Sequence, residues 1–362
     1  MKIGILTYHR AHNYGAVLQC YALQEILKKL GADVSIINYK QPHIERAYKP
    51  KYSIKHIIKL ILLFKFSTLK QYLSNIKKLY FRQYNFNKFR KNYLSCTKEC
   101  NEDNIPQNFD RYIIGSDQVW SIHCTKTFDQ TYWGGFKRKP TSKLFGYAIS
   151  CNGDFHNFID NKTVCNFFYR FDDITFREVK AQKEMEEVTG IRKNISLDPT
   201  LLTIDKIWSP FIKAKWKNKK YIVVYQIRRL KTSPKMLESK AQKYAQKHNL
   251  EVINLSGMFY SVEDFVSLIK YAQCVFTSSF HATVFSIIFE RPFYTFLLYD
   301  NHDERYKDLL IKLNLSDHLV DQNTEICDHI PFITNIDEAK RNLNRMKVDS
   351  ISYLKKIVSD YK

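Results

Sequence analysis

The most informative stretch of the chain is Cys274–Phe296, CVFTSSFHATVFSIIFERPFYTF, because it carries both a unit of fold and a candidate site. It predicts a short strand at Cys274–Thr277, a polar turn, a helix at Ala282–Glu290 and a second strand after Pro292. A strand that is followed at once by a helix and another strand is typical of a parallel α/β sheet.

The polar turn of this stretch has the chemistry of an anion site. Ser278 and Ser279 are predicted to cap the helix, and His281 is predicted to lie in or beside its first turn. Free N–H groups and the positive end of a helix dipole attract anions, and parallel sheets bind ligands at the carboxyl ends of their strands. A histidine here suits a phosphate or carboxylate ligand. The alternative is that His281 only caps its own helix, and this stretch alone does not separate the two.

The same alternation of strand-like and helix-like segments continues along the chain. Further strands are predicted at Ile3–Leu6, Val34–Ile37, Arg111–Ile114, Lys143–Ile149, Ile174–Phe176, Tyr221–Gln226 and Val252–Leu255. Further helices are predicted at Gly15–Leu30, Glu178–Val188, Met236–His248, Val262–Tyr271, Tyr306–Leu313 and Ile336–Asp360. A seam at Asp198–Pro210, where two prolines and a tryptophan break the pattern, separates residues 1–200 from residues 201–362. The chain is therefore predicted to be α/β, with two Rossmann-like domains and a cleft between them.

Positive charge is concentrated in one segment of the N-terminal domain. The formal net charge is +21, and fourteen lysines and arginines but no aspartate or glutamate lie from Arg46 to Lys98. Ile57, Ile58 and Ile61 fall on one helical face there, which predicts a basic helical insertion. The insertion could contact an anionic membrane, track nucleic acid, or pack on its own domain with solvated lysines. No motif that reads nucleic acid accompanies the charge, so nucleic acid is not predicted as a partner.

Composition excludes several other classes of protein. The eight cysteines form no CxxC pair, and Cys96 and Cys100 lack the partners of a zinc site. The opening MKIGILTYHR contains no signal-peptide core, and no apolar run approaches the length of a membrane span. With 44% hydrophobic residues, a chain of 362 residues can bury a sizeable core. We therefore expect a cytoplasmic chain with reduced thiols and no metal.

Polar or glycine residues follow several of the predicted strands. After the first strand come Asn13, a candidate helix cap, and Gly15, which permits close backbone approach to a ligand. Asp117 lies in the loop GSDQVW, Arg177 follows a strand, and Arg305 precedes a helix. Each of these also suits a capped turn or a surface position, and one glycine is no dinucleotide fingerprint. Together they predict a polar, cationic cleft for a small polyanion.

Five motifs occur in order along the chain: HRAHNYGAVLQCYALQ, IGSDQVW, TFRE, SLDPTLL and SSFHATVFSIIFERPF. Together they resemble the polysaccharide pyruvyl transferase family, from the first strand to about Leu313. The resemblance implies a GT-B-like fold of two Rossmann-like domains. It also implies transfer of the enolpyruvyl group of phosphoenolpyruvate onto a sugar, with formation of a pyruvate ketal. The sugars of the family belong to capsular, exopolysaccharide or wall-polymer repeat units, often while they are carried on a lipid.

The resemblance also implies roles for single residues. His281 matches the family histidine at the phosphoenolpyruvate site, and Arg177 matches an arginine that holds the anionic groups of the donor. Arg305 is a further counterpart among the cations. Ser279, Phe280 and His281 stand where many members have Arg-Leu-His, so one donor-binding cation is missing from this position.

Pyruvyl transfer requires clustered cations, a general acid and a general base. His281 is predicted to contact the phosphate and relay a proton, and Asp117 is predicted to deprotonate the sugar. The residues predicted to bind substrate are Arg177, Ser278, Ser279, Arg305, Asn13, Tyr14 and Gly15. Phosphoenolpyruvate is a substrate of this reaction, so neither a cofactor nor a metal is predicted.

The predicted partners are phosphoenolpyruvate and a sugar acceptor. A lipid-linked acceptor, and peripheral contact with the anionic inner face of the membrane, are open alternatives. The rival function is a GT-B nucleotide-sugar-dependent glycosyltransferase of polysaccharide biosynthesis, because a fold does not fix a function. A basic adaptor without enzymatic activity is a second rival, but it would leave the loop motifs of both halves without a purpose.

Overall fold

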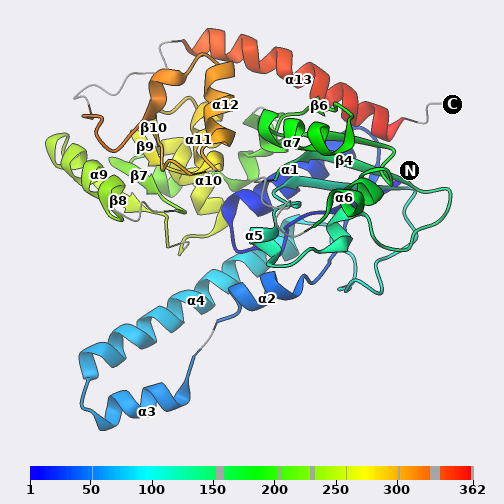
Figure 1. The fold of residues 1–362 in the computed structure, drawn as a ribbon. Coiled ribbons are helices and arrows are strands. Elements are labelled where there is room, and N and C mark those ends of the chain that lie inside the picture. Colours follow the sequence, from blue (N-terminus) through cyan, green and yellow to red (C-terminus); the bar gives the residue numbers. More distant parts are fainter. Residues whose placement is uncertain are drawn as a thin grey trace.

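Two parallel β-sheets form the framework of the molecule (Figure 1). The computed structural model describes residues 1–50, 52–151, 159–202, 205–228, 233–257, 259–300, 302–326 and 335–359. Within these ranges the N-terminal sheet has six strands in the order β2-β1-β3-β4-β5-β6, and the C-terminal sheet has five in the order β11-β10-β9-β7-β8. The first sheet contains β1 (Lys2–Leu6), β2 (Asp33–Ile36), β3 (Arg111–Asp117), β4 (Lys143–Ile149), β5 (Asp173–Phe176) and β6 (Asn194–Ile195). The second contains β7 (Tyr221–Tyr225), β8 (Glu251–Asn254), β9 (Cys274–Thr277), β10 (Phe293–Phe296) and β11 (Leu319–Val320).

The central strands of both sheets are covered on both faces. β7, with the sequence YIVVY, is buried at every position, and so is β3. Parallel strands buried in this way are nearly continuous apolar runs, which is why the sequence pattern identified them. The register pairs Ile5 of β1 with Ile113 of β3, and Val223 of β7 with Val275 of β9. The prediction of an α/β chain with two Rossmann-like domains is confirmed.

Helices connect the strands and cover the sheets. They include α1 (Tyr14–Lys29), α5 (Ile122–Thr125), α6 (Asn161–Phe168), α7 (Val179–Thr189), α8 (Pro199–Leu202), α9 (Met236–Lys247), α10 (Val262–Tyr271), α11 (Phe280–Ile288) and α12 (Glu304–Lys312). At the start of α1, the ring of Tyr14 stacks on Phe265 of α10 at 4.4 Å, and its hydroxyl donates a hydrogen bond of 2.8 Å to the carbonyl of Tyr260. Tyr14, which was predicted to bind substrate, therefore packs between the two halves.

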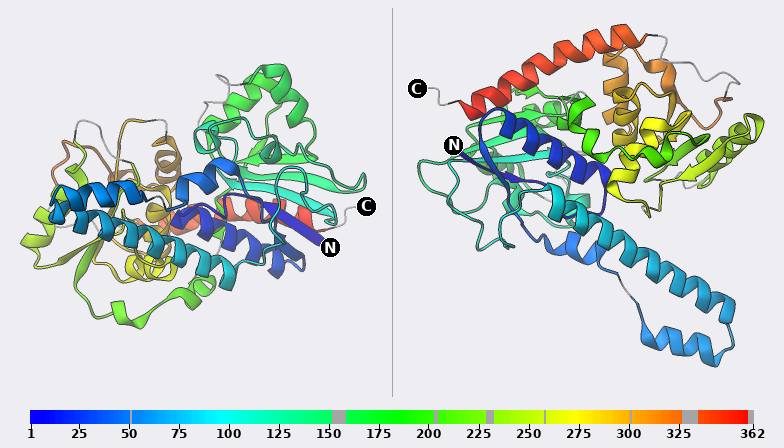
Figure 2. Two further views of the ribbon diagram at one scale, coloured as in Figure 1. Left: turned by 90° about the horizontal axis from the view of Figure 1, so that it is seen from below. Right: turned by 180° about the vertical axis from the view of Figure 1, so that it is seen from behind.

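Helix α13 (Ile336–Val358) contacts both halves of the molecule (Figure 2). Near its start, Lys340 forms a 2.7 Å ion pair with Glu290, which follows α11. Farther along, the hydroxyl of Ser350 accepts a hydrogen bond of 2.9 Å from the backbone N–H of Leu197. The hydroxyl of Tyr353 donates a hydrogen bond of 3.1 Å to a carbonyl in β4. The closing helix, which the sequence placed with the C-terminal domain, thus also covers the N-terminal sheet.

Several element boundaries beside the candidate site differ from prediction. α12 begins at Glu304, so Arg305 lies in the helix and not before it, as was predicted. α11 begins at Phe280, two residues earlier than predicted, with Ser279 in extended backbone as its N-cap residue. β3 continues past Ile114 to Asp117, although GSD is typical of a turn. Pairing of Asp117 with Ile149 of β4 keeps these polar residues in the sheet, where they are buried.

The basic segment folds as a helical hairpin that projects from the body of the molecule (Figures 1 and 2). It follows the short helix α2 (Pro42–Tyr48) and consists of α3 (Ile54–Leu62) and the long α4 (Phe66–Tyr93). Only the C-terminal part of α4 packs on the core, through Phe86 and Phe89. In the described parts of the chain, no helix has both the length and the apolar character needed to cross a bilayer.

Candidate functional site

A pocket of about 370 Å³ lies where the carboxyl ends of the two sheets meet. It is lined by residues that follow β1 and β3 of the first sheet and β7, β9 and β10 of the second. Ligands of open parallel sheets bind at such edges. The predicted site residues that line the pocket are Asn13, Asp117, Ser278, Ser279, His281 and Arg305. Tyr14, Gly15 and Arg177 are not among the lining residues.

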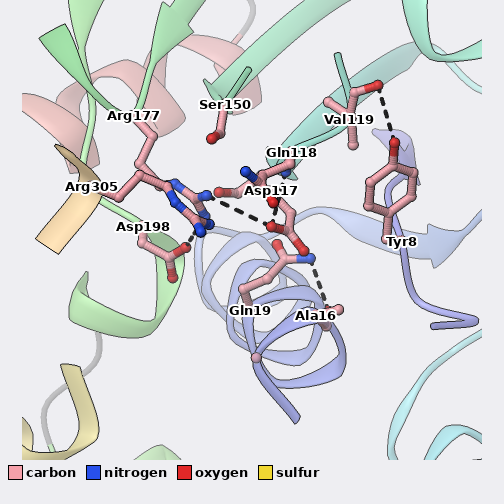
Figure 3. Close-up of polar contacts among 12 residues, drawn as sticks. Tyr8, Ala16, Gln19, Asp117, Gln118, Val119, Ser150, Arg177, Asp198 and Arg305 are labelled. Carbon is pink, nitrogen blue, oxygen red and sulfur yellow. Dashed lines mark hydrogen bonds and ion pairs between the residues drawn. The ribbon is translucent and has the colours of Figure 1, made fainter. Parts of the chain in front are cut away.

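Arg177 is buried beside the pocket and has three carboxylates around it, of which Figure 3 shows Asp117 and Asp198. Its Nη1 donates a hydrogen bond of 2.9 Å to Asp198, while carboxylate oxygens of Glu178 and Asp117 lie 3.5 and 3.7 Å from its other nitrogens. The guanidinium also lies over the ring of Phe280, 5.0 Å from the ring centroid. Burial alone would lower the pKa of Arg177, but the three acids raise it above its ordinary value. An arginine whose charge is already balanced is suited to positioning its neighbours.

Asp198 links this ion cluster to the histidine. Its Oδ1 accepts hydrogen bonds from the backbone N–H and the hydroxyl of Thr200, at 3.0 and 2.6 Å. Its Oδ2, which accepts the bond from Arg177, lies 3.5 Å from Nε2 of His281. Burial would raise the pKa of Asp198, but the charges of His281 and Arg177 hold it below its ordinary value. The sequence pattern treated Asp198 as part of the seam between domains, and the structure makes it the residue that orients His281.

Replacing Asp198 with asparagine is expected to lower the free energy of unfolding at pH 7 by about 3 kcal/mol, because a buried ion pair loses one partner. The folded-state pKa of Asp198 is depressed, so its contribution is present above the unfolded-state pKa of about 3.9 and is lost as the pH falls below that value. The difference between parent and variant should therefore shrink from about pH 5 to about pH 3, as measured by urea unfolding. Asp33→Asn, at an exposed position of β2, is the control. A difference that is independent of pH would contradict the role of the Asp198 charge.

Gly15 lies against the imidazole of His281. A Cβ on Gly15 would be 2.0 Å from Nδ1 of His281, so only glycine leaves room for the ring. The group that closely approaches this backbone is therefore the histidine, where the sequence predicted a ligand. Asn13 caps α1 as predicted, since its Oδ1 accepts hydrogen bonds from the N–H groups of Gly15 and Ala16 at 2.9 and 3.3 Å. Nε2 of His281 faces Asp198 and is sealed from solvent, which leaves Nδ1 as the ring nitrogen that a ligand can reach.

Arg305 and Arg228 form a cationic wall of the pocket, and His302 lies beside them. Burial, together with the positive charges of neighbouring arginines, lowers the pKa of Arg305 to about 10. Burial, together with the positive charges of Arg305 and Arg228, lowers the pKa of His302 to about 4. Arg228 forms ion pairs with Asp300 and Asp303, whereas no carboxylate of the described residues lies within ion-pair distance of Arg305. An anionic ligand would supply the missing negative charge.

Sequence reasoning missed Arg228 and His302, although the signal was available. Arg228 follows β7 and His302 follows β10, just as the predicted site residues follow other strands. Gln118, which was noted only within its motif, connects the two halves because its Nε2 lies 3.2 Å from Nδ1 of His302. A search of every loop after a predicted strand would have found all three.

The turn before α11 does not cap the helix in the predicted way. Ser279 occupies the N-cap position, but its hydroxyl is buried and has no hydrogen-bond partner. Ser278 donates a long hydrogen bond of 3.4 Å to the carbonyl of Arg228. The predicted capping by Ser278 and Ser279 is therefore wrong, because Thr277 fixes the turn by accepting a 3.0 Å hydrogen bond from the N–H of Ser279. A buried hydroxyl without a partner is costly, so Ser279 and the first N–H groups of α11 are placed to donate to a ligand.

Asp117 is the only acid among the described lining residues. Its backbone φ is +85°, a conformation that costs a non-glycine residue about 1–3 kcal/mol and that occurs mostly at functional sites. Its Oδ1 accepts a 2.9 Å hydrogen bond from the N–H of Gln118 and lies 3.7 Å from Nη2 of Arg177. No group of three or more His, Cys, Asp or Glu side chains in the described ranges is arranged to hold a metal ion.

Comparisons with known proteins were made for the sequence and for the fold. A family model described as polysaccharide pyruvyl transferase matches residues 13–301. No curated protein matches the chain. Among solved structures, a putative UDP-N-acetylglucosamine 2-epimerase from Listeria monocytogenes aligns with a TM-score of 0.47 and 9% identity, over 98% of this chain and 90% of that one. The ADP-heptose LPS heptosyltransferase II of E. coli aligns with a TM-score of 0.34 and 9% identity, over 96% of this chain and 99% of that one.

Proposed function

The chain belongs to the polysaccharide pyruvyl transferase family, and on this premise we propose that it transfers the enolpyruvyl group of phosphoenolpyruvate to a sugar. The product is a pyruvate ketal on a sugar of a cell-surface polysaccharide repeat unit, and phosphate is released. One observation carries the proposal: a histidine oriented by a buried aspartate faces a cationic pocket at the start of a helix.

The pocket suits a small donor with two anionic groups. Phosphoenolpyruvate carries a carboxylate and a phosphate, which need charge-assisted hydrogen bonds and helix N–H groups. Arg305 and Arg228 supply the guanidinium groups, and Ser279 with the first turn of α11 supplies neutral donors. Arg228 follows β7 and Arg305 lies in the first turn of α12, and we propose that these two cations replace the arginine that many family members carry at the position of Ser279. Arg177 would act indirectly, by fixing Asp198 and Asp117.

His281 is the proposed general acid. Its Nδ1 can reach the ligand while Asp198 lies 3.5 Å from Nε2 on the other side of the ring. Protonation of the methylene carbon of phosphoenolpyruvate would develop positive charge on the adjacent carbon. One sugar hydroxyl then adds to that carbon, phosphate leaves, and a second hydroxyl closes the ketal. Of the two hydroxyl protons, one ends on the new methyl group and one leaves with phosphate, so the reaction balances.

Asp117 is the proposed base for the sugar hydroxyl. As the acid that lines the pocket, it can accept a hydroxyl proton, and its contact with Arg177 keeps a charged partner close by. Asp117 and His281 come from opposite sheets, so the acceptor would lie between the two halves.

Replacing Arg305 with glutamine is expected to raise the KM for phosphoenolpyruvate by about 10- to 100-fold, because a charge-assisted hydrogen bond is worth about 1.5–3 kcal/mol. The ligand-free protein should be no less stable, since burial and neighbouring cations already disfavour this charge. Steady-state kinetics and thermal unfolding measure the two effects. Lys307→Gln, on the same helix and paired with Glu304, is the matched control. An unchanged KM would remove Arg305 from the donor site.

A donor screen by mass spectrometry tests the function as a whole. Phosphoenolpyruvate and nucleotide sugars are offered in turn with soluble and lipid-linked glycans as acceptors. A gain of one pyruvyl unit as a ketal, with release of phosphate, supports the proposal. Release of a nucleoside diphosphate with transfer of a sugar would instead support the rival glycosyltransferase function.

A further inference from the structure

The far end of the helical hairpin exposes apolar side chains that the fold does not cover. We define the hairpin tip as residues 54–73, which comprise α3, the connecting loop and the first two turns of α4. Its exposed large apolar residues are Ile54, Ile58, Ile61, Leu62, Leu63, Phe64, Phe66 and Leu73. Leu62, at the end of α3, and Phe64, just after it, are 71% and 79% exposed. The turn that joins α3 to α4 is where the hairpin extends farthest from the body (Figure 1). Contiguous exposed apolar surface of this kind marks an interaction site.

The hairpin is an ordered element, so the exposure does not come from an unfolded segment. Leu60 is buried between α3 and α4. The hydroxyl of Tyr72 accepts a 2.9 Å hydrogen bond from the N–H of Ser53, and its ring contacts His56 at 4.8 Å. These contacts bury one side of α3, and the other apolar side is left for a partner.

The charge around the tip indicates the chemistry of that partner. Lys55, Lys59, Lys65 and Lys70 are exposed among the apolar residues, and the whole segment from Arg46 to Lys98 contains no acid. Apolar side chains flanked by lysines match the layered chemistry of a bilayer, in which acyl chains lie beneath anionic headgroups. Lysine stems lie along apolar surface while the ammonium groups stay in the polar layer.

Other partners fit these observations less well. A second copy would bring two cationic tips together with no acid to neutralise them, and like charges oppose such contact. Nucleic acid would pair with the lysines but would leave Leu62, Leu63 and Phe64 without a function. The surface therefore favours an anionic lipid bilayer.

We propose that the hairpin tip inserts into the headgroup layer of an anionic membrane and so tethers the molecule, with its pocket, to that surface. The base of the hairpin reaches the pocket, because α2 contributes His43, Ile44 and Tyr48 to the lining and Arg82 of α4 lies over the ring of Tyr48 at 5.8 Å. An acceptor sugar carried on a lipid would thus be presented to the pocket. Only this last step rests on the proposed function, since membrane insertion does not depend on catalysis.

Vesicle binding by the full chain, without donor, tests the insertion. We expect binding to vesicles of phosphatidylcholine with phosphatidylglycerol, release at high salt, and at least about tenfold weaker binding to phosphatidylcholine alone. Leu62→Ser/Leu63→Ser/Phe64→Ser and Lys55→Gln/Lys59→Gln/Lys65→Gln/Lys70→Gln should each weaken binding by at least about tenfold. The matched control, Tyr169→Ser/Ile311→Ser/Val348→Ser, changes three exposed apolar residues elsewhere and should bind as the parent does.

Two further measurements separate the outcomes. Brominated lipids should quench the fluorescence of the tryptophan introduced by Phe64→Trp. They should not quench the fluorescence of the tryptophan introduced by Tyr169→Trp. Tip variants should keep normal turnover on a water-soluble acceptor, so a failure of membrane binding is distinguishable from a failure of the proposed reaction. Equal binding to neutral and anionic vesicles, or unchanged vesicle binding by the tip variants, would overturn the proposal. So would a dimer that forms through the hairpin tip and does not bind vesicles.

Discussion

Replacing His281 with alanine is expected to lower kcat for transfer by about 10²- to 10⁴-fold, which is the usual contribution of a general acid. The histidine is the pocket residue whose ring is oriented by a buried carboxylate, 3.5 Å from Nε2. Its loss removes the group that donates the proton, whereas the cations of Arg305 and Arg228 that line the pocket remain. The KM for phosphoenolpyruvate should therefore change much less than kcat. Single-turnover kinetics with a soluble acceptor measure the two separately.

His281→Gln is the second variant, because glutamine keeps most of the buried volume while its amide side chain cannot act as a general acid. His248→Ala, at the end of α9 and outside the pocket, controls for loss of a histidine as such. Circular dichroism and thermal unfolding establish that each variant is folded. Near-normal turnover of folded His281→Gln would show that the residue only packs against Gly15.

Replacing Gly15 with alanine is expected to lower kcat by about 10²-fold or more, because the added methyl group would displace the ring of His281. The same overpacking should lower the free energy of unfolding by about 1–3 kcal/mol. In the His281→Ala background the methyl group meets no imidazole, so Gly15→Ala should then cost little. In that background the helix preference of alanine over glycine, about 1 kcal/mol, favours the alanine variant.

A double-mutant cycle on unfolding free energies measures this coupling between the two positions. Gly31→Ala is the control, because a Cβ there meets no atom within 4 Å and any cost comes only from its positive φ of 94°. That cost should be the same with and without His281. Additive effects of Gly15→Ala and His281→Ala would contradict the contact.

The fold could be predicted largely because its strands are buried on both faces. β7 and β9 consist of apolar residues flanked by turns, so local pattern and tertiary structure agree. β3 was predicted too short because its last residues are polar, and only pairing with β4 explains why Ser116 and Asp117 stay in the sheet. The basic segment was predicted to be helical, but its projection as a hairpin depends on which faces find partners.

The candidate site could be predicted only in part. Asn13 was identified as a cap because capping is local in sequence. The contact of Gly15 with His281 spans 266 positions in the chain, so no local pattern could reveal it. Asp198 was interpreted as a turn because Asp-Pro is typical of one, whereas its partners Arg177 and His281 come from other strand ends. Ion pairs between distant segments are a property of the folded sheets.

Helix α13 has a consequence for how the two halves can move. It is joined to one half by the ion pair of Lys340 with Glu290 and to the other by the hydrogen bonds of Ser350 and Tyr353. A wide hinge opening would have to bend this continuous helix or break one set of contacts. Rotation of the halves is therefore restrained on the side of α13. We expect substrate entry and product release to depend on small adjustments of the loops around the pocket, with the arrangement of His281, Asp198 and Gly15 already formed in the ligand-free chain.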